Sequence, residues 1–286
     1  MEISLTETRG VVTRFAPSPT GYMHLGHAYA ALQAWRLARE RNGKFLLRIE
    51  NIDKDRCREE FEEAILEDLL WLGLSWDGQP RRQSQNMRDY KRALDKLNRN
   101  ELLYPCFCTR KEILAEISQA GAAPHELHGH IYPGTCRRLT QAQQQERFAQ
   151  GKIYALRLDM EKALALTGSL VWTDLKKGAQ TCQNVSGDVV LARKDIPTSY
   201  HLAVTVDDHK QRVNIVTRGI DLFAATHIHR LLQTLLDLNT PEWEHHELIT
   251  DNQGKRLSKR GRAPTIRSLR RAGESPESIK AMIGQN

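Results

Sequence analysis

The order of apolar runs and helical segments in the first quarter of the chain constrains the fold most. Val11–Phe15 is a short β-branched run, Ala16–Gly21 is a Pro/Ser/Thr/Gly loop, and His24–Arg41 is rich in alanine. Lys44–Glu50 is predicted to be a buried strand, and Glu59–Leu72 has apolar residues at helical spacing. Strands that alternate with helices build parallel sheets covered by helices. We therefore expect an α/β fold with a doubly wound parallel sheet.

The alternation is interrupted at Tyr104–Arg138, where we expect a small insertion with its own core. Three shorter strands are predicted after it, at Ile153–Leu158, Leu170–Trp172 and Val189–Ala192. The alternation of strand, helix and strand then resumes at Val213–Val216, Leu222–Leu238 and Glu247–Thr250.

Composition excludes the membrane and disordered classes of protein. With 40% hydrophobic and 27% charged residues over 286 positions, the chain has the balance of a soluble globular protein. No apolar run approaches the ~20 residues that span a bilayer, and Met1–Gly10 lacks the pattern of a signal peptide. We expect a cytoplasmic protein with no membrane segment.

The net charge of +7 is concentrated at the carboxyl-terminal end. Gly254–Asn286 contains nine basic and two acidic residues, whereas the preceding part of the chain is balanced. A localised basic segment favours a polyanionic partner, either nucleic acid or the phosphates of a nucleotide. The alternative is a tail that is simply solvated.

Two separated segments are candidates for a nucleotide site. His24 and His27 lie where a loop enters a helix, and their spacing places both imidazoles on one helical face, with Gly26 leaving room for a nucleotide. Lys255 and Lys259 follow a predicted turn, and ammonium groups there can neutralise the charge of a triphosphate. Either segment alone has a commoner explanation, packing for the histidines and a solvated turn for the lysines.

Together with other segments, they give the chain a resemblance to the class I aminoacyl-tRNA synthetases, and within them to the glutamyl branch. The segments that carry it span nearly the whole chain. They are Arg14–Gly21, His24–His27, Leu47–Glu50, Tyr200–Ala203 with Val206–His209, Val216–Gly219 and Leu257–Lys259. The resemblance implies a Rossmann-like catalytic domain that activates glutamate with ATP. It also implies Mg²⁺ as a cofactor, which binds together with ATP.

A pocket for glutamate needs cations for two carboxylates and an anion for the ammonium. Arg14 and Arg218 can each donate two hydrogen bonds to a carboxylate, and Glu50 can pair with the ammonium. The sequence does not decide which arginine takes the side-chain carboxylate. The resemblance implies a glutamate-binding set of Arg14, Ala16, Ser18, Glu50, Tyr200 and Arg218. Asn51 stands where family members commonly have Asp, and we leave it out of the site.

The resemblance also implies which residues act on ATP as the glutamate α-carboxylate attacks its α-phosphate. The residues expected to stabilise that transition state are His24, His27, Lys255 and Lys259. The expected ATP-binding set is His24, Gly26, His27, Leu257, Ser258 and Lys259. Because no side-chain nucleophile is required, we interpret Cys57 and Cys182 as ordinary thiols.

Three cysteines lie within 31 positions and indicate a metal site: Cys106, Cys108 and Cys136. A structural Zn²⁺ takes four tetrahedral ligands, so the thiols leave one position to fill. The spacing Cys-x-Cys followed by Tyr-x-x-x-Cys resembles a shorter family of the branch, the glutamyl-Q tRNA(Asp) synthetases, and on that resemblance Tyr132 is the fourth ligand. His128 and His130 are chemically more usual rivals, and three reduced cysteines without metal are a further alternative.

The length of the chain after Lys259 bears on the acceptor of the glutamyl group. Only 27 residues follow, whereas a domain that reads an anticodon needs roughly 50 or more. We expect no anticodon-binding domain, an architecture that resembles the glutamyl-Q family, which transfers glutamate to queuosine in the anticodon loop of tRNA(Asp). The partners implied are ATP, L-glutamate and queuosine-containing tRNA(Asp), and we expect a monomeric enzyme. The basic tail, together with Arg137 and Arg138, is expected to bind RNA phosphates.

The predicted domain boundaries follow from these assignments. The Rossmann-like catalytic domain is expected in two halves, 1–103 and 189–262, the second of which holds the Lys-Arg-Leu-Ser-Lys loop. Between them we place a zinc-binding insertion at 104–138 and a connecting acceptor-side α/β segment at 139–188. A short basic tail follows at 263–286.

Three alternatives stay open at this point. The first is a truncated glutamyl-tRNA synthetase that acts on tRNA(Glu). The second is a nucleotidyltransferase with a similar His-x-Gly-His loop, and the third is an inactive synthetase-like RNA-binding protein. The paired arginines and the Lys-Arg-Leu-Ser-Lys segment disfavour the nucleotidyltransferase, and the intact His24, His27 and Glu50 disfavour the inactive protein.

Overall fold

The first strands and helices of the fold form where local sequence predicts them. The computed structural model describes residues 10–119, 132–182, 187–249 and 264–284. In it β1 (Val12–Phe15) leads into α1 (Leu25–Glu40), and β2 (Lys44–Ile49) into α2 (Glu59–Trp71). After α2 the chain turns at Gly73, whose φ of 78° is a conformation that favours glycine.

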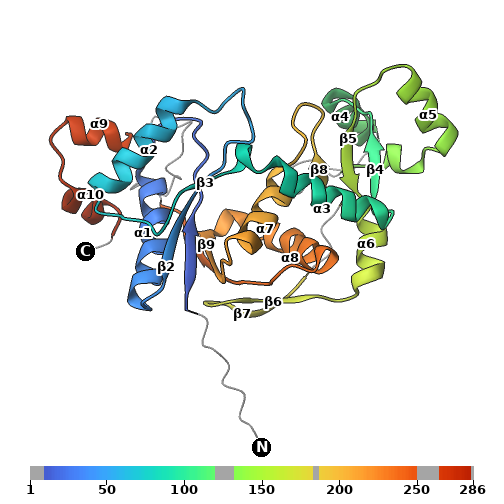
Figure 1. The fold of residues 1–286 in the computed structure, drawn as a ribbon. Helices are drawn as coiled ribbons and strands as arrows, with labels where there is room; N and C mark the ends of the chain where they lie inside the picture. Colours follow the sequence, from blue (N-terminus) through green and yellow to red (C-terminus); the bar gives the residue numbers. More distant parts are fainter. Residues whose placement is uncertain (1–9, 120–131, 183–186, 250–263, 285–286) are drawn as a thin grey trace, which may run out of the picture.

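The remaining elements complete a chain of alternating helices and strands (Figure 1). They are β3 (Arg81–Arg82), α3 (Met87–Arg99), β4 (Leu103–Cys106), α4 (Arg110–Gln119), α5 (Gln141–Ala149), β5 (Ala155–Leu158), α6 (Met160–Thr167), β6 (Val171–Asp174), β7 (Gly178–Thr181), β8 (Val190–Ala192), α7 (Tyr200–Lys210), β9 (Ile215–Gly219), α8 (Ala225–Leu236), β10 (Glu242–His246), α9 (Ile266–Arg271) and α10 (Pro276–Met282). Short 3-10 helices lie at Gln83–Gln85, Thr135–Arg138 and Ile220–Leu222.

Two sheets of mainly parallel strands meet in the middle of the molecule. One has the order β1-β2-β3 and is parallel, and the other has the order β7-β6-β10-β9, in which only the β6–β7 pair is antiparallel. At the start of β9, the Asn214 backbone N–H donates to the Val12 carbonyl at 3.1 Å, and Asn214 Oδ1 accepts from the Val12 N–H at 2.7 Å. β1 and β9 therefore lie side by side, and the expected α/β fold with a parallel sheet is confirmed.

The insertion has a small core of its own, as expected. β4 pairs antiparallel with β5, and β5 with β8, in a third sheet that lies away from α1 and α2 (Figure 1). The buried members of the insertion core are Tyr104, Cys106, Phe107, Tyr132 and Cys136. β4 contains the first residues of the insertion and β5 belongs to the segment that follows it, so their pairing joins the two segments in one sheet.

The strand predicted at Glu247–Thr250 is wrong. The strand is β10, Glu242–His246, while residues 247–249 are not in a strand and Thr250 lies outside the described residues. The sequence Glu-Trp-Glu-His-His has little apolar character, yet Trp243 is buried and His245 finds a buried partner in Asp174. Tertiary partners therefore make the strand begin five residues before the predicted one.

The described part of the basic tail is folded rather than simply solvated. α9 and α10 pack against α2 and α1, and Ile266 of α9, Ile279 of α10 and Ile283 just after α10 are buried in the same core as those helices. Arg270 of α9 pairs with Glu67 of α2 at 2.6 Å. Within the residues that the structure describes, no helix has both the length and the apolar character to cross a bilayer.

Candidate functional site

A pocket of about 460 Å³ opens at the carboxyl ends of β1, β2, β9 and β10. Open parallel sheets bind ligands at this edge, and the volume falls in the ~300–1,000 Å³ range usual for ligand sites. Nine predicted site residues line it: Arg14, Ala16, Ser18, His24, Gly26, His27, Glu50, Tyr200 and Arg218. The other predicted ATP-site residues, Lys255, Leu257, Ser258 and Lys259, lie outside the described residues.

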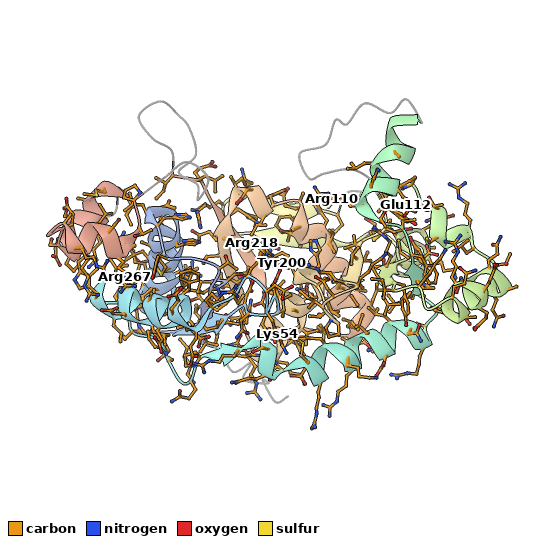
Figure 2. The ribbon with its side chains drawn as sticks, turned by 90° about the horizontal axis from the view of Figure 1, so that it is seen from above. Lys54, Arg110, Glu112, Tyr200, Arg218 and Arg267 are labelled. Carbon is orange, nitrogen blue, oxygen red and sulfur yellow. The ribbon has the colours of Figure 1, made fainter. Side chains whose placement is uncertain are left out.

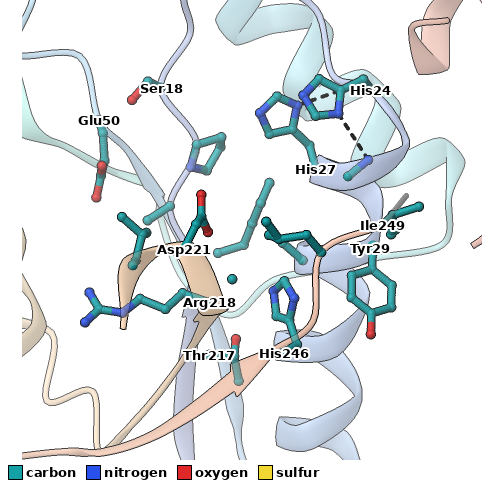
Figure 3. A pocket seen from close by; sticks show the side chains of 18 of the residues that line it. Ser18, His24, His27, Tyr29, Glu50, Thr217, Arg218, Asp221, His246 and Ile249 are labelled. Carbon is teal, nitrogen blue, oxygen red and sulfur yellow. Dashed lines mark hydrogen bonds between the residues drawn. The ribbon is translucent and has the colours of Figure 1, made fainter. Parts of the chain in front are cut away.

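The two ends of this pocket carry different chemistry. Figure 3 shows Glu50 and the Arg218 guanidinium on one side, and the imidazoles of His24 and His27 on the other. In the view of Figure 2, Arg218 and Tyr200 lie near the middle of the molecule. A ligand that spans the pocket therefore meets an anion and buried cations at one end and two imidazoles at the other.

The two histidines cap the amino terminus of α1. Nδ1 of His24 accepts from the backbone N–H of Gly26 at 3.1 Å, and Nδ1 of His27 accepts from the backbone N–H of His24 at 3.3 Å. Because both Nδ1 atoms accept, each neutral ring carries its proton on Nε2. The ring centroids are 3.9 Å apart. The cap thus fixes both rings in the tautomer that can donate from Nε2.

Arg14 and Arg48 share one buried carboxylate. Oδ1 of Asp208, on α7, accepts from Arg14 Nε at 3.0 Å and from Arg48 Nη1 at 2.7 Å. Arg14 also donates from Nη1 to the Thr217 carbonyl of β9 at 3.0 Å. Burial alone would raise the pKa of Asp208, but the two arginines hold it below its ordinary value. The network fixes the Arg14 side chain between β1, β9 and α7.

Glu50 faces the pocket from the end of β2. Its Oε1 accepts from Arg48 Nη2 at 3.2 Å, and its side chain is only 10% exposed. Burial raises the pKa of Glu50 above its ordinary value, against the opposing effect of Arg48. A cation that enters the pocket would favour the ionised carboxylate, which is the chemistry expected for binding an ammonium group.

Arg218 differs from the other two buried arginines in its partners. Its three nitrogens contact His245, His229 and Thr226, which are all uncharged acceptors. Burial lowers the pKa of Arg218 from its ordinary value. No carboxylate forms an ion pair with it among the residues the structure describes, so a ligand carboxylate would supply the missing charge.

Sequence reasoning missed several residues of this site. Tyr29, His246, Leu248 and Ile249 line the pocket, and their rings and aliphatic side chains suit a flat apolar group. Asp208 lies in the segment Val206–His209, which contributes to the family resemblance, but only the fold reveals that its carboxylate binds two arginines. By contrast, Asn51, which we left out of the site, accepts from the backbone N–H of Ser84 at 2.9 Å.

The three predicted cysteines come together in the insertion. Their sulfurs lie within 4.8 Å of one another, and those of Cys108 and Cys136 are 3.4 Å apart. Tetrahedral zinc with Zn–S bonds of about 2.3 Å would separate its sulfurs by about 3.8 Å, so these thiols fit a metal site. Hydrogen bonding from Cys106 lowers the pKa of Cys136, whereas the same contact and burial raise the pKa of Cys106, so of these two thiols Cys136 is the one more readily ionised.

Tyr132 is placed beside the same sulfurs. Its hydroxyl lies 3.6 Å from Cys108 Sγ and accepts from the Cys136 backbone N–H at 2.8 Å. The Arg157 guanidinium stacks over the Tyr132 ring at 3.8 Å from its centroid, so a positive charge lies near the cluster. The rival ligands His128 and His130 lie outside the described residues.

A second, smaller hollow lies at α9, beside the histidine end of the main pocket. It is lined by Tyr22, Thr265, Arg267, Ser268 and Arg271, and Thr265 bridges to His24. Arg267 donates to the Tyr22 hydroxyl at 2.9 Å. Figure 2 shows Arg267 toward one end of the molecule, with Arg110 and Glu112 on the other side of Arg218 and Tyr200.

Comparisons with known proteins find similar sequences over nearly the whole chain. Residues 10–285 match the family model of class I tRNA synthetases (E and Q), catalytic domain. The glutamyl-Q tRNA(Asp) synthetase of Rhodobacter capsulatus is 44% identical over 286 residues, covering 96% of this chain and 100% of that protein. The protein of that name from Nocardia farcinica is 43% identical, covering 96% and 84%.

A solved structure adds a comparison of length. A glutamate tRNA ligase from Elizabethkingia meningosepticum, solved in complex with its amino acid, matches with a TM-score of 0.79 at 28% identity. The match covers 96% of this chain but 60% of that ligase. The chain thus spans about three-fifths of the length of that ligase.

Proposed function

The chain belongs to the catalytic-domain family of class I tRNA synthetases (E and Q), and from that premise we propose that it joins glutamate to queuosine in tRNA(Asp). It is a ligase-type enzyme that activates glutamate for a tRNA-related reaction. In the proposed sequence, ATP and L-glutamate form glutamyl-adenylate without tRNA, and the glutamyl group then passes to the modified base.

One observation carries the first step. Residues from separate segments of the chain line one pocket, with Glu50 and Arg218 at one end and His24 and His27 at the other. In the proposal glutamate occupies the first end, where its ammonium meets Glu50 and a carboxylate meets Arg218. Arg14 already pairs with Asp208, so Arg218 is the better candidate for a strong new ion pair.

The triphosphate of ATP is assigned to the histidine end. The Nε2–H groups of His24 and His27 can donate to phosphate oxygens as negative charge builds on the leaving pyrophosphate. Tyr29, His246 and Ile249 are proposed to hold the adenine. Lys255 and Lys259 are proposed to complete the charge neutralisation, with Leu257 and Ser258 beside them and Mg²⁺ carried by the ATP.

The cysteine cluster is proposed to hold one structural Zn²⁺. Cys106, Cys108 and Cys136 supply three sulfurs, and the Tyr132 hydroxyl is the proposed fourth ligand because it already lies against them. When bound, the ion would cross-link β4 to the segment after residue 132 and so fix the insertion on its sheet.

The acceptor is inferred from the relatives. Five curated relatives named glutamyl-Q tRNA(Asp) synthetase are 39–44% identical to this chain, at 83–100% coverage of their own length. A queuosine base in an anticodon loop is an unpaired nucleotide, which proteins can bind splayed out of its stack. The proposed RNA contacts include the hollow at α9.

ATP–pyrophosphate exchange tests the first step. Exchange should depend on glutamate, require no tRNA, and fail with glutamine, because a neutral amide would leave buried Arg218 without its counter-charge. Equal exchange with both amino acids would refute the assignment of the pocket.

A further inference from the structure

Among the residues that the structure describes, the hydrogen-bond partners of the Arg218 guanidinium are uncharged acceptors. Its Nε donates to Nε2 of His245 at 3.2 Å, and its Nη1 donates to Nδ1 of His229 at 3.1 Å. Its Nη2 donates to the Thr226 hydroxyl. The residue is 6% exposed, so these contacts replace water around a buried cation.

The tautomers of both histidines follow from this arrangement. A guanidinium can only donate, so the imidazole nitrogens that face it must be unprotonated. His245 therefore carries its proton on Nδ1, which lies 2.7 Å from Oδ2 of Asp174. His229 carries its proton on Nε2, which lies 3.1 Å from Nδ1 of His201. Each ring is thus oriented by a second partner behind it.

The rings remain neutral for a physical reason. Burial and the charge of Arg218 lower the pKa of His245 to about 4, despite the opposing effect of Asp174. The same two causes lower the pKa of His229 well below its ordinary value. At neutral pH both imidazoles therefore accept hydrogen bonds from Arg218 without cancelling its charge.

We propose that His245 and Asp174 are positioning residues for amino-acid recognition, which orient Arg218 while leaving its charge for the carboxylate of the substrate. Asp174 lies behind the imidazole of His245, so it fixes the tautomer and does not touch the guanidinium. His229, like His245, is a neutral acceptor, and it orients the guanidinium through Nη1 of Arg218. A carboxylate in direct contact would instead neutralise Arg218, as Asp208 does for Arg14. This inference rests on the proposed function, since it names what makes that pocket select an anion.

Two variants of nearly equal shape separate charge from geometry. In His245→Gln the side-chain oxygen can take the place of Nε2 and stays neutral, whereas His245→Glu puts a carboxylate against Arg218. In pyrophosphate exchange, we expect the KM for glutamate to rise only a few-fold in His245→Gln and by about tenfold or more in His245→Glu. The KM for ATP should change less than about twofold in both.

Thermal melting shows whether each variant is folded. If both variants raise the KM for glutamate equally, or raise the KM for ATP as much as that for glutamate, the role of His245 is merely structural and the inference is overturned.

Asp174→Asn gives a further readout, because an amide can also donate and so removes the preference for the Nδ1-protonated tautomer of His245. We expect it to raise the KM for glutamate and leave that for ATP.

A spectroscopic measurement separates failure of this inference from failure of the proposed function. Imidazole ¹⁵N shifts of the unmodified protein at pH 7 should show His245 protonated on Nδ1 and His229 on Nε2. Protonation of His245 on Nε2 would overturn the network whatever the enzyme activates. Absence of glutamate-dependent exchange in the unmodified protein, with these tautomers present, would instead refute the proposed function.

Discussion

Arg14 on β1 and Asp208 on α7, which are 194 residues apart in the chain, meet in a buried ion pair with 3.0 Å between Nε and Oδ1. The same carboxylate binds Arg48 from β2 at 2.7 Å. One anion therefore joins the first half of the fold to a helix of the second half, and its two partners, Arg14 and Arg48, connect it to the pocket, since Arg14 lines the pocket and Arg48 donates to Glu50.

Removal of this anion should destabilise the fold strongly. We expect Asp208→Asn to lower the free energy of unfolding by about 3–5 kcal/mol, because two buried guanidinium groups lose their shared counter-charge. Asp195→Asn is the matched control, since Asp195 pairs with Arg193 on the surface, where an ion pair is worth roughly 1 kcal/mol or less. Urea denaturation measures both. Equal, small losses would contradict the central place of Asp208.

Local pattern predicted the elements that begin the first half of the fold. The run Val11–Phe15 and the helix after His24 were predictable because each signal lies within a few residues. The pocket residues were predictable for another reason, since their types and order resemble those of a known family. Neither route identifies Asp208 as a shared partner, because that role depends on three elements that only tertiary structure brings together.

The parts that local pattern could not predict depend on contacts between distant residues. β10 forms from Glu-Trp-Glu-His-His because β9 and β6 flank it, and His245 is buried because Asp174 lies beside it. The network around Arg218 is invisible in sequence for the same reason. In the basic tail, the few apolar residues Ile266, Ile279 and Ile283 matter more than the charge, because they anchor two helices in the core.

Metal removal should affect the insertion. Purified protein is expected to hold about one zinc ion per chain, and Cys106→Ser to release it and lower the melting temperature, because metal binding is coupled to folding. Tyr132→Phe removes only the hydroxyl oxygen and should lower the zinc content, whereas His130→Ala should leave it unchanged. Elemental analysis measures both, and the reverse result would show that Tyr132 is not the fourth ligand.

Asp68 should make stability depend on pH. It is a buried residue of α2 whose Oδ2 has no hydrogen-bond partner among the residues that the structure describes, and burial raises the pKa of Asp68 to about 6. Because the folded state binds this proton more tightly than the unfolded chain does, the protonated carboxyl favours the folded state. The full contribution to stability is present below the unfolded-state pKa of about 3.9, and it is lost as the pH rises through the folded-state pKa of about 6.

The resulting loss of unfolding free energy between pH 4 and pH 7 should be about 2 kcal/mol. We expect Asp68→Asn to remove this component, while Glu63→Gln, at an exposed site on the same helix, retains it. Chemical denaturation at several pH values measures the difference. An unchanged pH profile in Asp68→Asn would argue that the buried carboxyl titrates normally.

RNA binding should distinguish the arginines of α9. Arg267 and Arg271 line the hollow beside Tyr22, whereas Arg270 is paired with Glu67. We expect the double variant Arg267→Ala, Arg271→Ala to reduce the slope of log binding constant against log salt by about 1 for each RNA phosphate that these arginines neutralise. Arg270→Ala is the control and should change the slope less. Identical slopes for all three proteins would exclude the hollow from the RNA interface.

Transfer of labelled glutamate to RNA tests the central proposal most directly. The enzyme, ATP and glutamate are incubated with tRNA(Asp) that carries queuosine, with the same tRNA lacking the modified base, and with tRNA(Glu). Our account predicts label on queuosine-containing tRNA(Asp), and on its isolated anticodon arm, with none on the other two. Label at the 3′ end of tRNA(Glu) would contradict it and would identify the chain as a glutamyl-tRNA synthetase instead.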